Sequence, residues 1–372
     1  MTRIVATYAA AGEGHRRASE AVVAAAQSLM ATVELRDCLE GSAPWFRQTY
    51  TQGYLALVRN APTLWGGLYG LTDLVGGSRC VRFLRRWGNV RQGRSLAQWL
   101  TDHRPAAVIA THFFPVEVVA ALKRSGALHT RLVSVITDWL PHSFWLAPEV
   151  DQYAVASEAT RRALITRGVD AARITVTGIP IDERFATPLD RQSTAARLGL
   201  DPSRFTVLIG SGGFGLGPVE GLVKVFARVP QPCQLLVVAG RHERLRLSVE
   251  ALRPAIPHPM MVYGFIHNMD ELMAVSDVLI SKPGGLTCAE AMARRVPLVA
   301  VSPIPGQESR NSEVLVQEGA AVRLSRMAEL PSWVARLHDP TWYAKMAHAA
   351  ERLGKPHAAR DVLRLALELA HG

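Results

Sequence analysis

Two short segments of the chain place glycines and polar side chains directly after predicted β-strands. Residues 281–290 follow an apolar run at 277–280, and residues 305–311 follow another at 297–301. Because each run gives way to a helical pattern, we expect both segments at the carboxyl edge of one parallel sheet. Open α/β sheets bind nucleotides at that edge. Nucleotide binding is therefore the first hypothesis.

Four residues of these segments carry groups that could hold a sugar or a ribose. Thr287 and Glu290 have the Thr-x-x-Glu spacing of a capping box, in which each side chain satisfies a backbone amide at a helix start. The Glu290 carboxylate could instead accept both hydroxyls of a ribose, although the spacing alone favours the cap. Gln307 and Glu308 could hydrogen-bond sugar hydroxyls or belong to an ordinary polar loop.

A further glycine-rich loop, at residues 210–217, also follows a predicted strand. Its backbone amides could wrap a pyrophosphate, with a hydroxyl from Ser211 and a close backbone approach at Gly212 and Gly213. The loop lacks the Gly-Lys-Ser/Thr ending of a Walker loop, and a plain glycine turn is the alternative.

The chain contains no Asp-x-Asp pair that could bridge a pyrophosphate through a metal ion. No metal or other cofactor is therefore expected. The charge of a departing phosphate would be met by backbone amides, helix ends and the side chains of Lys282 or Arg241.

Two further strand ends supply groups that could move a proton. Gly14 and His15 lie on the first predicted strand–helix turn, where the helix start disfavours protonation of the imidazole. A neutral His15 could accept a proton from a hydroxyl, or it could only cap the helix. Asp138 and His142 follow the strand at 132–137, and Asp138 could activate a hydroxyl or form an Asx turn.

These groups fit an alternation of strands and helices in both halves of the chain, which is typical of βαβ units with a parallel sheet. Two doubly wound, Rossmann-like α/β domains facing a cleft are the simplest architecture for 372 residues. We expect a first domain at 1–185, a linker at 186–194, a second domain at 195–355 and a C-terminal helix at 356–372 that could return to the first domain. Strands are predicted at 4–8, 32–36, 107–111, 132–137, 205–209, 234–239, 261–263, 277–280 and 297–301, and the first helix at 16–30.

The composition indicates a globular protein, because 48% of the residues are apolar and only 20% are charged. The four cysteines are scattered, which favours a reduced cytosolic setting over a zinc or disulfide framework. The first residues lack the pattern of a signal peptide, and no apolar run approaches the ~18 residues that span a bilayer. We therefore expect a protein that is soluble or lies on a surface.

Most of the net charge of +10 comes from residues 41–100, where eight arginines accompany a single acidic residue, Asp73. Arginines mixed with aromatic residues are typical of an element that lies on anionic lipid. A nucleic-acid surface, or a solvated helical face with its aromatics in the core, are the alternatives. The candidate membrane or acceptor contacts are Arg59, Trp65, Arg82, Arg85, Arg86 and Trp87.

The order of the motifs resembles the monogalactosyldiacylglycerol synthase family and its bacterial diacylglycerol glucosyltransferase relatives over nearly the whole chain. More distantly, the chain is similar to the N-acetylglucosaminyltransferase that completes the lipid-linked peptidoglycan precursor. The matching motifs are Gly-Glu-Gly-His-Arg-Arg-Ala at 12–18, Asn-Ala-Pro-Thr-Leu-Trp at 60–65, Thr-Asp at 137–138, Val-Thr-Gly-Ile-Pro at 176–180, Tyr-Gly-Phe at 263–265, Lys-Pro-Gly-Gly-Leu-Thr at 282–287 and Pro-Gly-Gln-Glu at 305–308.

The resemblance implies a GT-B glycosyltransferase that moves galactose or glucose from a UDP-sugar to diacylglycerol, with inversion. It would work at the cytoplasmic face of a membrane with anionic lipids. The resemblance implies His15 as the general base, with Asp138 also open as the proton acceptor. The implied nucleotide-sugar contacts are Gly14, Ser211, Gly212, Gly213, Arg241, Phe265, Ile266, Lys282, Gly284, Gly285, Leu286, Thr287, Glu290, Gln307 and Glu308.

Three other functions stay open at this point. The same fold carries transferases of N-acetylglucosamine to a lipid-linked cell-wall precursor and epimerases of UDP-N-acetylglucosamine. A non-enzymatic nucleic-acid binder would also use a basic segment, although we expect no nucleic-acid partner. Fold alone does not select among functions.

Overall fold

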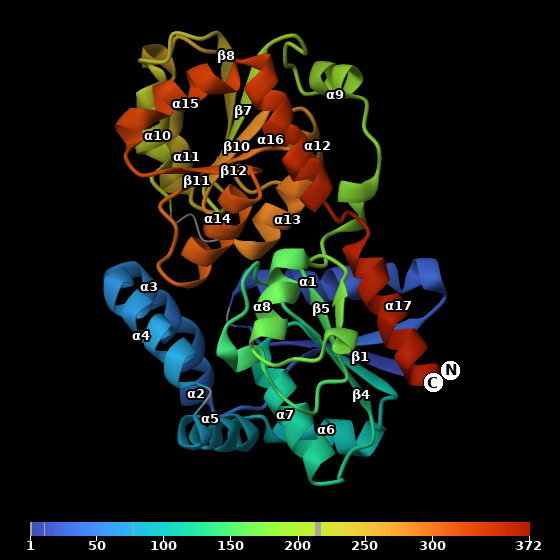
Figure 1. Ribbon diagram of the computed structural model, residues 1–372. Helices are drawn as coiled ribbons and strands as arrows, with labels where there is room; N and C mark the ends of the chain where they lie inside the picture. The colour runs from blue at the N-terminus through green and yellow to red at the C-terminus, as the bar shows by residue number, and fades with distance from the viewer. Residues whose placement is uncertain (1, 11, 77, 213–216) are drawn as a thin grey trace. The chain divides into compact units, whose positions relative to one another are not determined.

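The structure of the chain is a computed structural model that describes residues 2–10, 12–76, 78–212 and 217–372 (Figure 1). The side chains of residues 54, 55, 79, 80, 82 and 84 lie outside this description. The chain divides into two compact units. The first comprises Met1–Glu183, Pro305–Gln307 and His357–Gly372, and the second comprises Arg184–Ile304 and Glu308–Pro356.

The first unit is built on a six-stranded parallel sheet in the order β2-β1-β3-β4-β5-β6. Its central strands are mostly apolar and almost wholly buried because helices cover both faces of the sheet. The strands are β1 (Arg3–Tyr8), β2 (Thr32–Asp37), β3 (Ala107–Ala110), β4 (Arg131–Val135), β5 (Gln152–Val155) and β6 (Ile174–Val176). The helices that connect them are α1 (Glu13–Ala25), α7 (Phe113–Arg124) and α8 (Glu158–Thr166).

The last helix of the chain, α17 (Ala358–His371), lies beside α1 in the first unit (Figure 1). Val362, Leu363 and Ala366 are fully buried in a cluster with apolar residues of β1, β3 and β4. Burial of a valine or leucine side chain stabilises a fold by about 1.5–3 kcal/mol. The C-terminal helix is therefore part of the core of the first unit.

The basic segment between β2 and β3 is helical almost throughout. Figure 1 shows it as the blue and cyan helices of the first unit. It consists of α2 (Pro44–Gln48), a π-helical turn η2 (Thr49–Gly53), α3 (Tyr54–Asn60), α4 (Pro62–Val75), α5 (Arg79–Gln92) and α6 (Arg94–His103). Pro44 and Pro62 each open a helix, where the missing amide hydrogen costs nothing.

The second unit repeats the architecture with a six-stranded parallel sheet in the order β12-β11-β10-β7-β8-β9. The strands are β7 (Phe205–Gly210), β8 (Cys233–Val238), β9 (Met260–Tyr263), β10 (Val278–Ser281), β11 (Leu298–Val301) and β12 (Ala321–Leu324). The helices are α9 (Arg191–Arg197), α10 (Val219–Phe226), α11 (Glu243–Glu250), α12 (Met269–Ala274), α13 (Gly285–Ala293), α14 (Gln307–Gln317), α15 (Leu330–Leu337) and α16 (Pro340–Leu353). Short 3-10 turns occur in both units of the described chain, and they are η1 (Gln27–Leu29), η3 (Ser143–Trp145), η4 (Ala171–Arg173), η5 (Glu183–Ala186), η6 (Arg253–Ala255) and η7 (Met327–Glu329).

The alternating pattern correctly predicted two doubly wound sheets, but some local predictions were wrong. Strands β5, β6 and β12 were not predicted. The stretch expected as a linker contains the start of α9, whose N-cap Asp190 accepts a hydrogen bond from the Ser193 amide. The first helix begins at Glu13 and not near residue 16, which places His15 inside its first turn.

Candidate active site

The strand order of the first sheet reverses between β1 and β3, and the predicted base lies at this point. The chain runs outward from β1 to β2 and then returns to β3 on the other side of β1. In open α/β sheets such a switch point forms a crevice at the carboxyl ends of the two strands. The turn after β1 carries His15, and the turn after β3 carries Thr111 and His112.

His15 is held by the residues that follow β3 and β4. Its Nδ1 lies 2.8 Å from the carbonyl oxygen of Thr111 and 3.0 Å from Oγ1 of Thr137. A carbonyl oxygen can only accept a hydrogen bond, so Nδ1 carries the hydrogen and Nε2 carries the lone pair. This tautomer leaves Nε2 as the atom that can take a proton from a substrate.

The pKa of His15 is lowered to about 4, chiefly because burial disfavours the charged imidazolium. The bond to the Thr111 carbonyl opposes this shift and is the weaker effect. The imidazole is therefore neutral near pH 7, as a general base must be. The helix start was the predicted cause of this neutrality, whereas burial is the larger cause in the structure.

His112 is a neighbour of His15 that the sequence analysis missed. The two imidazole rings meet edge to face with their centroids 4.5 Å apart. Nδ1 of His112 accepts the Phe114 amide at 3.0 Å and so caps α7. Burial, and secondarily the proximity of His15, hold the pKa of His112 well below its usual value. The signal in the sequence was a polar pair, Thr111-His112, at the end of the strand predicted at 107–111.

Thr111 fastens the first turn of α1 to the end of β3. Its Oγ1 donates to the carbonyl oxygen of His15 at 2.8 Å and lies 2.9 Å from Oγ of Ser19. Both Thr111 and Ser19 are fully buried. Hydrogen bonds therefore hold both the backbone and the ring of His15 in place. Because the ring is already positioned in the free protein, less entropy is lost when a substrate is brought to it.

Asp138 and His142 lie in the loop after β4 and have different surroundings. Asp138 is buried and accepts a hydrogen bond from Nε1 of Trp145 at 3.4 Å. His142 uses both ring nitrogens within the fold, since Nδ1 accepts the Phe144 amide and Nε2 lies 3.1 Å from the Tyr69 carbonyl oxygen. His142 is therefore a structural residue, and only Asp138 keeps its predicted candidacy.

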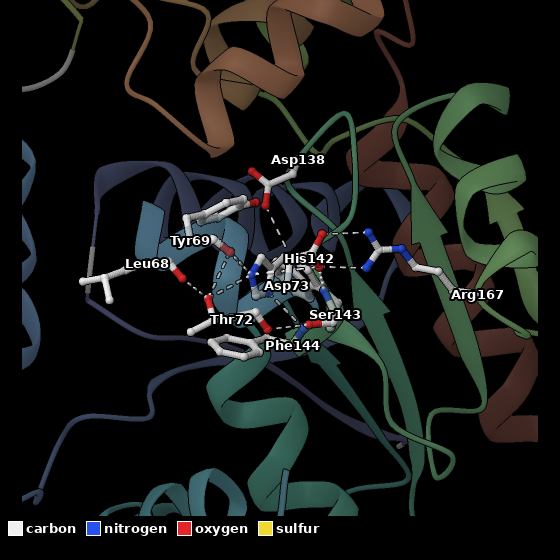
Figure 2. Close-up of polar contacts among 10 residues, drawn as sticks. Leu68, Tyr69, Thr72, Asp73, Asp138, His142, Ser143, Phe144 and Arg167 are labelled. Carbon is white, nitrogen blue, oxygen red and sulfur yellow. Dashed lines mark hydrogen bonds and ion pairs between the residues drawn. The ribbon is translucent and has the colours of Figure 1, made fainter. Parts of the chain in front are cut away.

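Asp73, the single acid of the basic segment, anchors α4 to the rest of the first unit. Figure 2 shows its carboxylate between Arg167 and the start of η3. It accepts two hydrogen bonds of 2.9 Å from the Arg167 guanidinium and one of 2.7 Å from the Ser143 amide. A bidentate pair of this kind fixes orientation as well as charge. The carboxylate is therefore turned inward, away from the surface of α4.

In the second unit the strand order reverses between β7 and β10, and most predicted nucleotide contacts follow these two strands. Ser211 and Gly212 come directly after β7, and Gly212 adopts a positive φ of 71° that favours glycine. Lys282 and Gly284 come directly after β10. Gly213 lies outside the described residues.

The capping-box interpretation of Thr287 and Glu290 is wrong. Helix α13 begins at Gly285 with Gly284 as its N-cap, so Thr287 already lies inside the first turn. Glu290 is almost fully buried one turn further along the helix. Leu286 is also buried. The spacing resembled a cap, but the Pro-Gly-Gly turn places the N-cap three residues earlier, at Gly284.

Lys282 and Glu308 lie close enough to each other, next to this turn, for each charge to affect the pKa of the other group. Burial lowers the pKa of Lys282, and the charge of Glu308 opposes that shift. Burial raises the pKa of Glu308, whose carboxylate accepts the Ile304 amide at 2.7 Å. Gln307 is the first residue of α14. Asn311, on the same helix, donates to the Pro283 carbonyl at 3.1 Å and braces the turn from inside.

The residues after β8 and β9 present an open aromatic surface. The Phe265 side chain is 53% exposed, and the Arg241 guanidinium lies 4.6 Å from the centre of its ring. Ile266 is half-buried beside it. An exposed ring with a stacked guanidinium is a suitable wall for a planar base.

The predicted membrane contacts separate into exposed and inward-facing residues. Arg59 and Trp87 are exposed, Trp65 and Arg86 are half-buried, and the Arg82 side chain lies outside the description. Arg85 instead pairs with the buried Glu117 at 2.5 Å and lies over the Phe144 ring. The Arg85 guanidinium is therefore turned toward Glu117, and a contact of Arg85 with lipid stays a prediction.

The exposed face of α4 carries an apolar stripe that the sequence analysis did not single out. We call it the α4 stripe, and it consists of Leu64, Leu68, Leu71, Leu74 and Val75, whose side chains are 38–84% exposed. Most of these positions follow the i, i+4, i+7 spacing of one helical face. Contiguous exposed apolar surface indicates an interaction site. In the described parts of the chain, no helix has the length and apolarity to cross a bilayer.

Comparison with families and curated proteins gives a consistent result. Residues 15–181 match the family described as Monogalactosyldiacylglycerol (MGDG) synthase, and residues 218–359 match the Glycosyltransferase family 28 C-terminal domain. A processive diacylglycerol beta-glucosyltransferase of Bacillus thuringiensis is 32% identical over 274 residues, which cover 73% of this chain and 70% of the relative. The Bacillus cytotoxicus protein of the same name is 33% identical over 280 residues, covering 75% and 71%.

Solved structures of low sequence identity share the fold. The crystal structure of Acinetobacter baumannii MurG has a TM-score of 0.67 at 15% identity and covers 99% of this chain and 100% of its own. Anabaena HepE in complex with UDP-glucose has a TM-score of 0.54 at 18% identity, covering 100% and 99%. Together with the two doubly wound sheets, these matches establish the GT-B fold.

Proposed function

Since the chain belongs to the family of monogalactosyldiacylglycerol synthases and diacylglycerol glucosyltransferases, we propose that it transfers a hexose from a UDP-sugar to diacylglycerol. The observation that carries the proposal is the 32–33% identity over about 70% of the length of proteins named as diacylglycerol glucosyltransferases. Glucose is the preferred donor sugar because these relatives bear that name. The product would be a β-glycosyl diacylglycerol.

The reaction centres on His15. The lone pair of Nε2 accepts the proton of the diacylglycerol hydroxyl as its oxygen attacks the anomeric carbon. A new C–O bond forms, the bond between the anomeric carbon and the phosphate oxygen breaks, and UDP leaves from the opposite face. This single displacement inverts the α-linked donor. With a pKa of about 4, His15 accepts the proton late, when the hydroxyl has become acidic in the transition state.

Most of the donor contacts are proposed on the second unit. The amides after β7 and at the start of α13 would meet the negative charge of the pyrophosphate, aided by Lys282 and Arg241. The Glu290 carboxylate would accept the ribose hydroxyls, and the backbone of Phe265 and Ile266 would hold the uracil. We propose no metal in this step, because the chain lacks an Asp-x-Asp pair. The sugar hydroxyls would be bound by Gln307 and Glu308.

The acceptor would be reached at a membrane surface. The α4 stripe has the length and spacing to lie in the plane of the bilayer interface with its leucines among the acyl chains. Exposed arginines such as Arg59 would add attraction to anionic lipids. We propose a peripheral enzyme at the cytoplasmic face, with the α4 stripe as its main apolar contact.

Single-donor reactions test the proposal. The purified chain would be incubated with diacylglycerol in vesicles and with UDP-glucose, UDP-galactose or UDP-N-acetylglucosamine in turn, followed by mass analysis of the lipid. We expect a monohexosyl diacylglycerol with UDP-glucose, and a fall in rate of roughly 10²–10⁴-fold in His15→Gln. The absence of any glycolipid, or transfer only of N-acetylglucosamine, would refute the assignment.

A further inference from the structure

Two histidines of the first unit stand side by side, and the proposed reaction uses only one of them. His15 and His112 have their ring centroids 4.5 Å apart and their ring planes at 90°. His15 lies in the first turn of α1, and His112 is the residue before α7. They come from the ends of β1 and β3, the two strands of the switch point. A group that reaches Nε2 of His15 therefore also comes close to the His112 ring.

The hydrogen bond at the start of α7 sets the tautomer of His112. Its Nδ1 accepts the hydrogen of the Phe114 amide at 3.0 Å, so Nδ1 carries a lone pair. Burial holds the pKa of His112 well below its usual value, and the imidazole is therefore neutral near pH 7. In a neutral imidazole with a lone pair on Nδ1, the hydrogen is on Nε2. His112 thus offers Nε2 as a hydrogen-bond donor.

His15 has the opposite tautomer. Its Nδ1 donates toward the Thr111 carbonyl oxygen, 2.8 Å away, and its Nε2 carries the lone pair. One ring of the pair therefore offers an acceptor, and the other offers a donor. An alcohol can use both, since its hydroxyl has one hydrogen to donate and two lone pairs that accept. Two neutral histidines of the same tautomer would not match a hydroxyl in this way.

The fold itself uses neither Nε2 atom. Among the residues that the structure describes, no hydrogen bond reaches Nε2 of His15 or Nε2 of His112. The His112 side chain is only 4% exposed, and a donor buried without a partner is unfavourable. Such unsatisfied groups in a folded protein call for an explanation, and a catalytic role is one. The Nε2 hydrogen of His112 is therefore available to a ligand.

The surroundings of the two rings are apolar. The ring of Trp145, which is 2% exposed, has its centroid 6.4 Å from that of His15 and 6.3 Å from that of His112. The centroid of the Phe113 ring lies 4.2 Å from that of His112. Hydrogen bonds are electrostatically stronger in such a setting than in water. An alcohol attached to an apolar molecule suits these surroundings, because its carbon atoms would contact the aromatic rings.

We propose that His112 binds the acceptor hydroxyl together with His15. The inference rests on the proposed function and assigns a second side chain to the acceptor site. The hydroxyl hydrogen points to Nε2 of His15, and Nε2 of His112 donates its hydrogen to one lone pair of the same oxygen. The second lone pair is left for the anomeric carbon, and its direction is fixed. His112 keeps its proton throughout, while the hydroxyl proton passes to His15.

Two variants of His112 separate its contact with the acceptor from its place in the fold. His112→Asn keeps a cap, because asparagine is a preferred N-cap residue, but it has no donor at the position of Nε2. His112→Gln does the reverse, since its longer amide can donate from near that position but is not a preferred N-cap. His242→Asn is the matched control, because Nδ1 of His242 caps α11 in the same way, through the Leu245 amide at 3.0 Å.

Binding is measured with two ligands that differ only in the hydroxyl. They are 1,2-dioctanoylglycerol and its 3-deoxy analogue, in which a hydrogen replaces the hydroxyl. We expect His112→Asn to bind dioctanoylglycerol roughly tenfold more weakly than the wild type, which corresponds to one hydrogen bond, and to bind the deoxy analogue at least as well. His112→Gln should recover part of the loss, and His242→Asn should bind both ligands as the wild type does.

A role of His112 in the fold alone would give a different result. His112→Asn would then change the affinities for both ligands by the same factor, and this outcome would overturn the proposal. Equal affinity of the wild type for the two ligands would also overturn it. Nitrogen-15 NMR gives a direct readout, since the hydrogen should be on Nε2 in His112 and on Nδ1 in His15. A hydrogen on Nδ1 of His112 would refute the assigned donor.

Kinetics separate the inference from the proposed function. With UDP-glucose as donor, kcat/KM for dioctanoylglycerol should fall by roughly tenfold or more in His112→Asn, while KM for UDP-glucose stays unchanged. A chain that distinguishes the alcohol from its deoxy analogue through His112 but makes no glycolipid would refute the enzymatic assignment alone. Normal glycolipid synthesis by His112→Asn, with unchanged affinity for both ligands, would refute the role of His112 alone.

Discussion

Replacing His15 by glutamine should change how stability depends on pH, by an amount that follows from the His15 pKa. In the folded protein that pKa is about 4, against 6.5 for a free histidine. Because the folded value is depressed, the unfolded chain takes up the proton first as the pH falls. The contribution of neutral His15 is therefore present above about pH 6.5 and is lost between about pH 6.5 and pH 4.

The size of the effect can be worked out for two pH values. At about pH 7.5 residue 15 is almost wholly neutral in both the folded and the unfolded protein, so its protonation does not change the free energy of unfolding. At about pH 5.5 the unfolded histidine is roughly nine tenths protonated and the folded one about one thirtieth, which costs about 1.4 kcal/mol of stability. Glutamine can still donate to the Thr111 carbonyl but does not titrate. The variant should therefore lose about 1.4 kcal/mol less than wild type between the two pH values.

Urea unfolding of both proteins at both pH values measures this difference. His112 is present in each protein, so its own titration largely cancels in the comparison. The kinetics give a second readout, since kcat/KM of the wild type should show no loss from His15 protonation down to about pH 5.5, where an ordinary histidine base would lose about tenfold. An acid limb centred near pH 6.5, together with equal pH dependence of stability in the two proteins, would show that His15 is not buried as described.

Substitutions at three other places test other parts of the structure. Glu117→Leu leaves the Arg85 guanidinium buried without its partner and should cost about 3–5 kcal/mol in urea unfolding, whereas Glu117→Leu/Arg85→Met should recover most of it. Recovery is expected because burial raises the pKa of Glu117 although the charge of Arg85 opposes this shift. The attraction between the two side chains is therefore smaller than the free-energy cost of removing the Glu117 carboxylate from water. Leu68→Ser/Leu71→Ser should weaken binding to neutral vesicles by roughly tenfold or more. Burying one leucine side chain contributes about 1.5–3 kcal/mol, and the variant has two fewer leucines to bury in the bilayer. Glu290→Gln should weaken UDP binding by about 10–100-fold, as measured by calorimetry. This factor corresponds to the contribution of one hydrogen bond to a charged group, which the variant would lose.

Matched controls decide these outcomes. Ile165→Ser/Leu247→Ser removes two exposed apolar side chains away from α4 and should leave vesicle binding unchanged. Glu313→Gln changes an exposed carboxylate on α14 and should leave UDP affinity unchanged. A control that behaves like its test variant would count against the α4 stripe or the ribose contact. A double variant as unstable as Glu117→Leu alone would count against the account of the buried pair.

The sequence by itself determined the fold class and the strand ends that carry polar groups. Apolar runs such as the one that ends at Ile209 are recognisable because a strand buried on both faces must be apolar throughout. Glycines and polar residues that follow such runs, as at His15 and Lys282, must then lie at the carboxyl edge of the sheet. The family resemblance added roles for these residues that the spacing left open.

Only the tertiary structure decided the surroundings of those residues, because they come from distant parts of the chain. The tautomer of His15 depends on Thr111, which is 96 residues away. The inward turn of Arg85 depends on Glu117, and the exposure of the α4 stripe depends on what packs against α4. The Thr287 spacing matched a cap, yet the turn at Gly284 set the helix start. The spacing of residues along a chain reveals only local periodicity. The burial of a side chain and the residue it contacts depend on packing between segments that are far apart in the sequence, and local periodicity does not show which segments these are.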